Sequence, residues 1–157
     1  MTKYKFTNPK KGEKKLNLEL KESEEAVSVV ETIVLKKNEM LNVDATVVHK
    51  AKNSLAKVLV KAVLYDNAEL TFRGNVKVEK NVTNCDSNLS LKVLLVGRGC
   101  KVIASPALEI ENNDVKCSHS VSISKPSEKE TFYLMSRGLS KVFAENLIAQ
   151  GFVRVEP

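Results

Sequence analysis

Residues 106–138 read PALEIENNDVKCSHSVSISKPSEKETFYLMSRG, and the chain changes from a strand-like to a helix-like pattern within this stretch. Before Pro126, apolar and polar residues alternate, which is typical of strands because successive side chains point to opposite faces. After Pro126, Ser127 and Glu130 have the spacing of a capping box, which predicts the start of a helix. The stretch therefore predicts a β region that ends at residue 125 and a helical region over residues 126–157.

The β region, residues 16–125, contains short runs of Val, Leu and Ile that recur roughly every ten residues, as in all-β proteins. A β-sandwich and a parallel β-helix both fit this pattern. Aromatic residues make up only 5% of the chain, and the aliphatic runs favour a β-helix, in which like residues stack in ladders, although no strict repeat is visible. The predicted breaks contain Asn, Asp or Gly, which tolerate left-handed backbone: Lys37-Asn38, Asn53-Ser54, Asp66-Asn67, Gly74-Asn75, Asn84, Gly97 and Asn112-Asn113.

The helical region has the pattern of a two-helix hairpin. The first helix is expected to run to about Arg137 and to stop at Gly138. Ser140 can cap a second helix, from about Lys141 to Gln150, which Gly151 would end. Two such short helices do not make a core of their own, so they must pack on the β region or on a partner.

The chain of 157 residues carries a net charge of +6, and most of this charge lies in residues 1–15, which hold six lysines and one acid. This basic N-terminal arm is either a solvated terminus or a segment that binds nucleic acid or an acidic partner. No apolar run is long enough to span a membrane, and the N-terminus has no secretory pattern. We therefore expect one cytoplasmic domain with no membrane association.

The three cysteines are expected to be reduced thiols rather than a disulfide framework. Cys117 and His119 are two positions apart, so on a strand they share one face and offer sulfur and nitrogen to a soft metal such as Zn or Fe. The alternative is an ordinary buried thiol and a hydrogen-bonded histidine. Two ligands do not complete a metal site, and the missing ones would come from a second subunit or from Cys85, Cys100, Glu109 or Glu111.

The sequence signals for catalysis are weaker than those for metal binding. Neighbours at positions i and i+2 on a strand rarely form a nucleophile–base pair, and no orienting acid accompanies Cys117 and His119. Gly97-Arg98-Gly99 is followed by Cys100 rather than by the residues of a phosphate-binding loop, so we interpret it as a turn. His49 has no nearby residue at metal-ligand spacing and is expected to be structural. The sequence therefore predicts a protein that is not an enzyme.

Residues from about 66 to 152 resemble the C-terminal core of the SufB/SufD family, the scaffold subunits of iron–sulfur cluster assembly. Residues 114–119 (DVKCSH) match a SufD-type motif, and residues 106–110 (PALEI) match a family strand. Residues 132–134 (FYL) and 136–139 (SRGL) match the helical signature. These motifs keep their mutual spacing. The departures are Ser118 and Ser120 beside the histidine, and the aliphatic Leu89, Leu91 and Val93 in a strand that is polar in the family.

The resemblance implies a right-handed parallel β-helix with C-terminal helices, dimerisation through the β-helix, and a SufC-like ATPase docked on the helical region. It also implies cluster assembly at the subunit interface, between a cysteine of SufB and a histidine of SufD. His119 falls on the SufD histidine, and Gly97 and Cys100 fall on the Gly-x-x-Cys of SufB. A homodimer would then bring Cys100 of one subunit to His119 of the other; a heterodimer with a paralogue is the alternative.

We therefore predict a dimeric scaffold subunit that holds an iron–sulfur cluster transiently and need not retain it when purified. Cys100, Cys117 and His119 are its candidate cluster ligands. Phe132, Tyr133, Arg137 and Phe143 are candidates for the ATPase-docking surface, or else they pack the hairpin on the β region. Two rival functions remain: an architectural dimeric subunit without a cluster, and a module that binds nucleic acid or an acidic partner through the basic arm.

Overall fold

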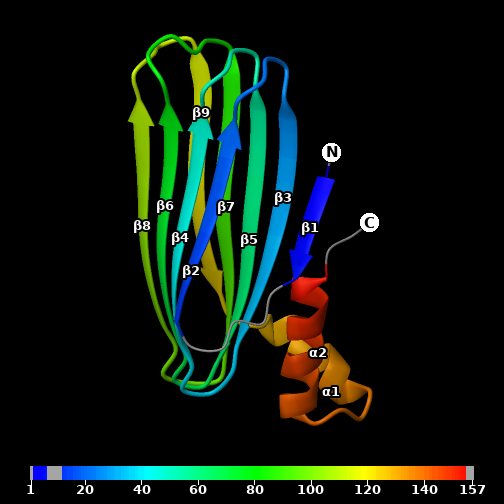
Figure 1. Ribbon diagram of the computed structural model, residues 1–157. Coiled ribbons are helices and arrows are strands. Elements are labelled where there is room, and N and C mark those ends of the chain that lie inside the picture. The colour runs from blue at the N-terminus through cyan, green and yellow to red at the C-terminus, as the bar shows by residue number, and fades with distance from the viewer. Residues whose placement is uncertain (1, 7–11, 155–157) are drawn as a thin grey trace.

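The computed structural model describes residues 2–6 and 12–154, with side chains from residue 12 onward. This part of the chain forms a β-solenoid of two parallel sheets, between which successive strands alternate (Figure 1). The sheet orders are β1-β3-β5-β7-β9 and β2-β4-β6-β8. The predicted β-helix is confirmed. The strands are β1 (Thr2–Phe6), β2 (Gly12–Leu20), β3 (Ala26–Leu35), β4 (Met40–His49), β5 (Leu55–Tyr65), β6 (Glu69–Val78), β7 (Cys85–Val96), β8 (Lys101–Ile110) and β9 (Val115–Ser124).

Each coil of the solenoid places its strands in parallel register on the strands of the coil before it. The register offset is 26 residues for Thr2 opposite Ser28 and 29 residues in the next coils, as in Ala26 opposite Leu55 and Met40 opposite Glu69. It becomes 31 for Leu55 opposite Asp86 and 32 for Glu69 opposite Lys101. These changing turn lengths explain why no strict repeat is visible in the sequence.

The space between the two sheets is filled by stacked aliphatic side chains. One inward column runs through Ile33, Ala62, Val93 and Ile123, each the register partner of the next. The first three are buried. Phe72 is the bulkiest fully buried side chain. Stacking of like residues between coils buries apolar area at every level, and this burial supplies most of the folding free energy.

The turns are built on asparagines in the left-handed backbone region. Asn38, Asn53, Asn67 and Asn84 all have positive φ between 54° and 61°. Their side chains also bond between coils: the Asn84 amide donates to Asn53 Oδ1 at 2.8 Å, and the Asn67 amide donates to Asn38 Oδ1 at 3.3 Å. The predicted breaks at these positions are therefore confirmed, and the residues that permit each turn also tie it to its neighbour.

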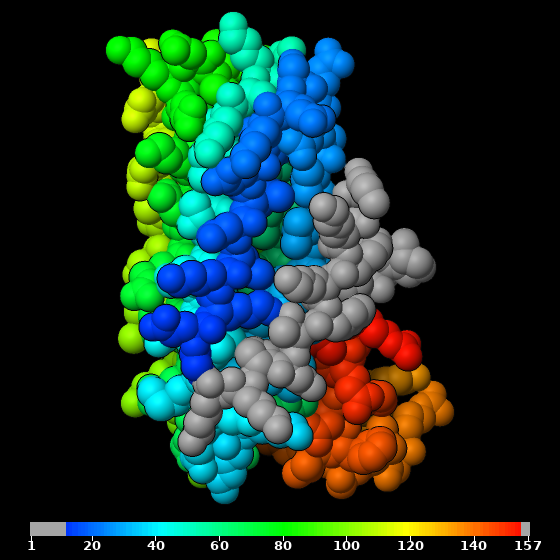
Figure 2. All heavy atoms as spheres, viewed as in Figure 1, coloured from blue at the N-terminus to red at the C-terminus, as the bar shows by residue number. Residues whose placement is uncertain are grey.

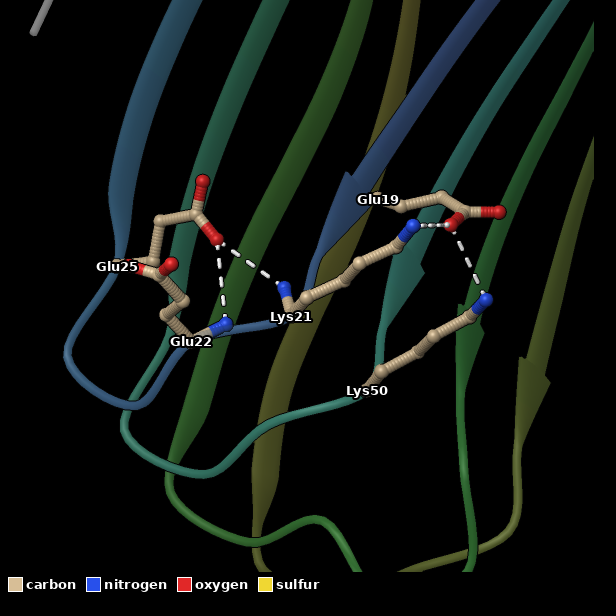
Figure 3. Close-up of polar contacts among 5 residues, drawn as sticks. All are labelled: Glu19, Lys21, Glu22, Glu25 and Lys50. Carbon is tan, nitrogen blue, oxygen red and sulfur yellow. Dashed lines mark hydrogen bonds and ion pairs between the residues drawn. The ribbon is translucent and has the colours of Figure 1, made fainter.

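The β2–β3 turn shows how charged side chains reinforce these connections (Figure 3). The Glu25 carboxylate accepts hydrogen bonds from the backbone N–H groups of Lys21 (3.1 Å) and Glu22 (3.4 Å). The Glu19 carboxylate lies 3.0 Å from the Lys21 ammonium and 3.1 Å from that of Lys50. Hydrogen bonds to these two lysines hold the pKa of Glu19 below its ordinary value. The Glu19–Lys50 contact links the first coil to the second.

The stretch predicted as a basic arm, residues 1–15, is partly built into the solenoid. β1 pairs with β3, and β2 begins at Gly12 and pairs with β4. Lys14 points inward and forms an ion pair with the fully buried Glu31. Lys10 and Lys11 lie outside the described residues. A boundary at residue 15 therefore does not separate an arm from the β core, because residues 12–15 already belong to a strand.

The predicted break at Gly74-Asn75 is wrong, because β6 runs without interruption from Glu69 to Val78. Gly74 is buried within the strand and pairs with Ala45 and Pro106 on either side. Its lack of a side chain serves packing rather than a turn.

The two helices form a hairpin against one flank of the solenoid (Figures 1 and 2). α1 spans Glu128–Ser136, and α2 spans Lys141–Val153. The hydroxyls of the predicted N-caps, Ser127 and Ser140, each accept a backbone N–H at 3.4 Å. The expected stop at Gly151 is wrong, since α2 continues through it. Neither helix of the described chain is long and apolar enough to cross a membrane.

The continuation of α2 has a packing reason. Val63, Leu94 and Val96 on the outer face of the first sheet form a small core with Ala149 of α2. Phe152 and Val153 pack against the same core, so ending the helix at Gly151 would remove two of its apolar contacts. The helix therefore extends because burial of these side chains outweighs the poor helix propensity of one glycine.

Candidate functional site

The candidate ligands Cys117 and His119 lie on β9, the last strand of its sheet. Both are half-buried and point between the sheets, whereas Ser118 and Ser120 between and beside them are exposed. The strand spacing in the sequence predicted this shared face. Cys117 stacks beyond Ser87, and His119 stacks beyond Leu89. The last coil thus carries its sulfur and nitrogen donors on the inner wall of the solenoid.

Cys117 lies beside a second cysteine. It packs against the small cluster formed by Val78, Val82 and the buried Cys85. Burial, and to a lesser degree the neighbouring Cys85 and Asp86, raises the pKa of the Cys117 thiol. The thiol is therefore protonated at neutral pH and is a poor nucleophile until a metal displaces its proton.

Cys85 belongs to a buried polar network that sequence reasoning missed. The Ser54 hydroxyl donates to the Ala51 carbonyl at 2.8 Å. The same oxygen lies 2.8 Å from His49 Nδ1 and 3.3 Å from Cys85 Sγ. Burial lowers the pKa of His49, which is fully buried and therefore neutral. Residues 49, 54 and 85 are brought together by coil stacking, and no local sequence signal could have shown this.

His119 has neither ring nitrogen hydrogen-bonded among the described residues, and both nitrogens are buried. Its ring lies against Gly74 of β6 on the opposite sheet, and Phe72 of the same strand also borders the space at Gly74. Burial lowers the pKa of the imidazole, so the ring is neutral at physiological pH. A neutral imidazole retains the lone pair that a metal ion needs.

Cys100 lies in the β7–β8 turn, half-buried, and its thiol donates to the carbonyls of Leu64 (3.5 Å) and Val96 (3.8 Å). Burial is the largest cause of a raised Cys100 pKa. Gly97 and Gly99 have φ of +92° and +73°, which lets the turn fold over the turn of the previous coil. There the Asp66 carboxylate accepts the Arg98 N–H at 3.0 Å.

Within one copy of the chain, Cys100 and His119 are far apart. Cys100 lies beside Val96, whereas His119 pairs with Leu89, seven residues earlier on β7. At about 3.3 Å per residue, this is a separation of roughly 23 Å along the sheet. The described residues hold no group of three or more His, Cys, Asp or Glu side chains able to bind a metal. The structure therefore brings Cys117 and His119 together and leaves Cys100 at the opposite end of the coil.

The last coil also leaves an apolar surface uncovered, because no further coil stacks on it in the described chain. Its inward positions carry apolar side chains that would be buried in any earlier coil. These are Leu108 (45% exposed), Ile110 (39%), Val121 (38%) and Ile123 (48%). Cys117 and His119 border this surface, which we call the open end of the solenoid.

The helical hairpin exposes the residues predicted to dock a partner. Phe132, Tyr133 and Phe143 are 74%, 57% and 60% exposed, so they do not pack the hairpin on the β region. The Arg137 guanidinium lies 5.4 Å from the centre of the Tyr133 ring, in a cation–π contact. A groove between the helices is lined by Tyr133, Leu134, Leu147, Ile148 and Phe152, among others.

Together these features define a parallel β-solenoid with soft donors on its last coil and an exposed C-terminal helical hairpin. Residues 6–152 match the family model "SUF system FeS cluster assembly, SufBD core domain". The chain therefore belongs to the SufBD family.

Named relatives agree with this membership. The iron–sulfur cluster assembly SufBD family protein of Galdieria sulphuraria is 34% identical over 107 residues, which are 68% of this chain and 48% of that protein. The corresponding protein of Staphylococcus saprophyticus is 29% identical over 117 residues, which are 74% of this chain and 25% of that protein. The chain thus spans between a quarter and a half of the length of these relatives.

The glycine turn before Cys100 yields a stability prediction. A Cβ at Gly97 would lie 2.0 Å from Asp66 Oδ1, whereas one at Gly138 would have no neighbour within 4 Å, although both have φ of +92°. Gly97→Ala should therefore lower the free energy of unfolding by about 2–4 kcal/mol, and Gly138→Ala by about 1–2 kcal/mol from backbone strain alone. Urea denaturation of both variants would measure the difference, and equal losses would show that the Asp66 contact is unimportant.

Proposed function

We propose that this chain is a scaffold subunit for iron–sulfur cluster assembly and is not itself an enzyme. The observation that carries the proposal is the last coil of a SufBD-family solenoid, which presents Cys117 and His119 beside an uncovered apolar surface. Thiolate and imidazole are the side chains that bind iron in clusters. The cluster is cargo on this scaffold: it is built and passed on rather than kept.

The chemistry of the donors fits transient holding. The raised pKa values of the Cys117 and Cys100 thiols keep both protonated in the empty protein. Iron must displace these protons to bind, so cluster affinity rises with pH and falls when protons compete. His119 needs no deprotonation because its lowered pKa already leaves it neutral.

The open end supports a dimeric arrangement. β8 and β9 are the last strands of their sheets, so each has one edge without a strand partner in the described chain. Apolar side chains at such an edge favour association, because burial removes them from water and pairing satisfies the backbone groups. A second copy or a paralogue of the same fold offers a matching surface.

A two-fold axis across the open end would also complete the ligand set. Such an axis reverses the strand direction of the second copy, so the Cys100 end of one last coil meets the Cys117–His119 end of the other. An axis that crosses the sheet midway between the two residues would close the separation of roughly 23 Å between copies. We infer two equivalent sites, each with Cys100 from one subunit and His119 from its partner.

The helical hairpin is the proposed docking surface for a SufC-like ATPase. Phe132, Tyr133 and Phe143 are exposed apolar side chains on two short helices, and Arg137 is held beside Tyr133. Aromatic and arginine side chains are the residues that dominate binding energy in protein interfaces. ATP hydrolysis in such a partner would supply the energy that the scaffold lacks.

Anaerobic reconstitution with iron and sulfide tests the cluster site. The wild-type protein should gain a visible charge-transfer absorption, because thiolate ligands donate electron density to iron. Cys100→Ala and His119→Ala should each lose at least about nine-tenths of this absorption, since each removes one ligand from both sites. Gly151→Ala, which changes a helix position with no neighbour within 4 Å of the added Cβ, is the control and should keep the band.

Absence of the band in wild type, or an unchanged band in both ligand variants, would contradict the proposed site. The first result would favour an architectural subunit, in which all three cysteines can be replaced without loss of function.

Substitution at the open end tests dimerisation. Leu108→Glu places a charge on the inward face of β8, where it should weaken self-association at least about tenfold because a buried charge without a partner is costly. Ile103→Glu is the matched control, since Ile103 is 61% exposed on the same strand but faces outward. Sedimentation velocity would measure both variants, and a dimer that tolerates Leu108→Glu would place the interface elsewhere.

A pull-down with a SufC-like ATPase tests the helical surface. The double variant Phe132→Ala, Tyr133→Ala should bind the ATPase at least about tenfold more weakly, because truncation of aromatic anchors removes most of their interface contacts. Met40→Ala is the control, since Met40 is 56% exposed on β4 of the β region. Equal capture of the double variant and wild type would rule out this surface.

A further inference from the structure

Gly74 is a glycine in the middle of a buried strand, where no turn requires it. It lies on the inward column formed by Leu16, Ala45, Gly74 and Pro106, each the register partner of the next. Glycine weakens a strand interior because it adds backbone entropy to the unfolded chain and packs no side chain. Such a glycine usually marks a place where another group approaches the backbone closely.

The group that approaches Gly74 is the ring of His119. A Cβ at Gly74 would lie 2.6 Å from His119 Nε2 and 2.8 Å from His119 Cε1. His119 itself ends the column Val29, Val58, Leu89, His119 on the opposite sheet, where it is the only member with a ring. Side chains thus shrink from Leu16 through Ala45 to Gly74 on one wall, which leaves room for the His119 ring from the other.

In this position the imidazole is held where it cannot coordinate. Its Nε2 and Cε1 edge faces the Gly74 backbone, and both ring nitrogens are buried without a hydrogen-bond partner among residues 12–154. Metal coordination needs a nitrogen lone pair directed at the metal. The ring must therefore turn out of the space at Gly74 before either nitrogen can meet a ligand at the open end.

We propose that Gly74 is a positioning residue for His119: its missing side chain forms the space in which the ring is held between rounds of cluster binding. Gly74 touches no cluster and acts only through His119. The role in cluster assembly rests on the proposed function, whereas the packing relation between the two residues does not. Phe72 forms the remaining wall, with its Cε1 2.8 Å from the same Cβ position.

A double-mutant cycle tests the packing relation. In the wild-type background, Gly74→Ala should lower the free energy of unfolding, because the added methyl group collides with the His119 ring. In the His119→Ala background the ring is absent, so the same substitution should change the unfolding equilibrium constant by a factor at least about threefold smaller than in the wild-type background. An equal cost in both backgrounds would mean that Phe72 alone sets the space, and it would overturn the inference.

The reactivity of His119 provides a readout that general destabilisation does not change. The chain has two histidines, and His49 is fully buried, so it serves as an internal reference. Diethylpyrocarbonate should modify His119 slowly in the wild-type protein and at least about tenfold faster in Gly74→Ala, because the methyl group forces the ring outward. Val76→Ala, a substitution on the same strand and face, is the control and should leave the modification of His119 as slow as in the wild-type protein. Equal His119 rates in wild type and Gly74→Ala would overturn the inference.

Iron–sulfide reconstitution separates this inference from the proposed function. Under the inference, Gly74→Ala keeps the charge-transfer band and forms it faster than wild type, whereas His119→Ala loses it. If His119→Ala keeps the full band, the proposed function fails whatever Gly74→Ala does. If His119→Ala loses the band but Gly74→Ala shows neither packing coupling nor faster assembly, only the role of Gly74 fails.

Discussion

In-register stacking of parallel strands is the constraint on which the rest of this structure depends. Every inward side chain rests on its register partner in the coil before, so each coil provides the surface that buries the next. The column Val58, Leu89, His119 shows the consequence. The first two members are buried between neighbouring coils, whereas His119 is half-buried because nothing stacks beyond it in the described chain. The same rule makes Leu108 and Val121 exposed, although identical positions one coil earlier are buried.

Burial within this stack also sets the protonation of the candidate ligands. The Cys117 and Cys100 thiols have raised pKa values, and the His119 imidazole has a lowered one, with burial the largest cause in each case. Burial disfavours the charged form of each group, so all three are neutral in the isolated chain. The two thiols can therefore bind a metal only when it displaces their protons, whereas His119 needs no deprotonation. Under the proposed function, competition from protons at the two thiols favours release of the cluster.

Much of the fold could be predicted from local sequence because its signals are local. Asparagines at positive φ marked the turns at residues 38, 53, 67 and 84, and Ser127 and Ser140 marked the helix starts. The alternation of β9 placed Cys117 and His119 on one face. The errors were also local: Gly74 and Gly151 were interpreted as breaks, because a glycine has no signal that distinguishes a turn from a close contact. In both cases tertiary packing decided the outcome.

Long-range register lay beyond the sequence. The offset between coils varies from 26 to 32 residues, so neither the contact of Cys117 with the Cys85 cluster nor the network of His49, Ser54 and Cys85 could be derived from spacing. The separation of Cys100 from His119 depends on the same register, and it bears directly on the candidate site. A coil that carries its two strongest candidate ligands at opposite ends cannot use them together by itself.

That separation and the open end are two consequences of one geometry. Because strands of a coil run in opposite directions on the two sheets, the β7–β8 turn that carries Cys100 and the start of β9 lie at opposite ends of the solenoid (Figure 1). A partner related by a two-fold axis would cover the exposed apolar side chains and reverse the ends in the same step. One dimer interface would then both cover the apolar surface and complete the ligand set. The site would exist only in the assembled dimer, so loss of the dimer would release the cluster as well as expose the core.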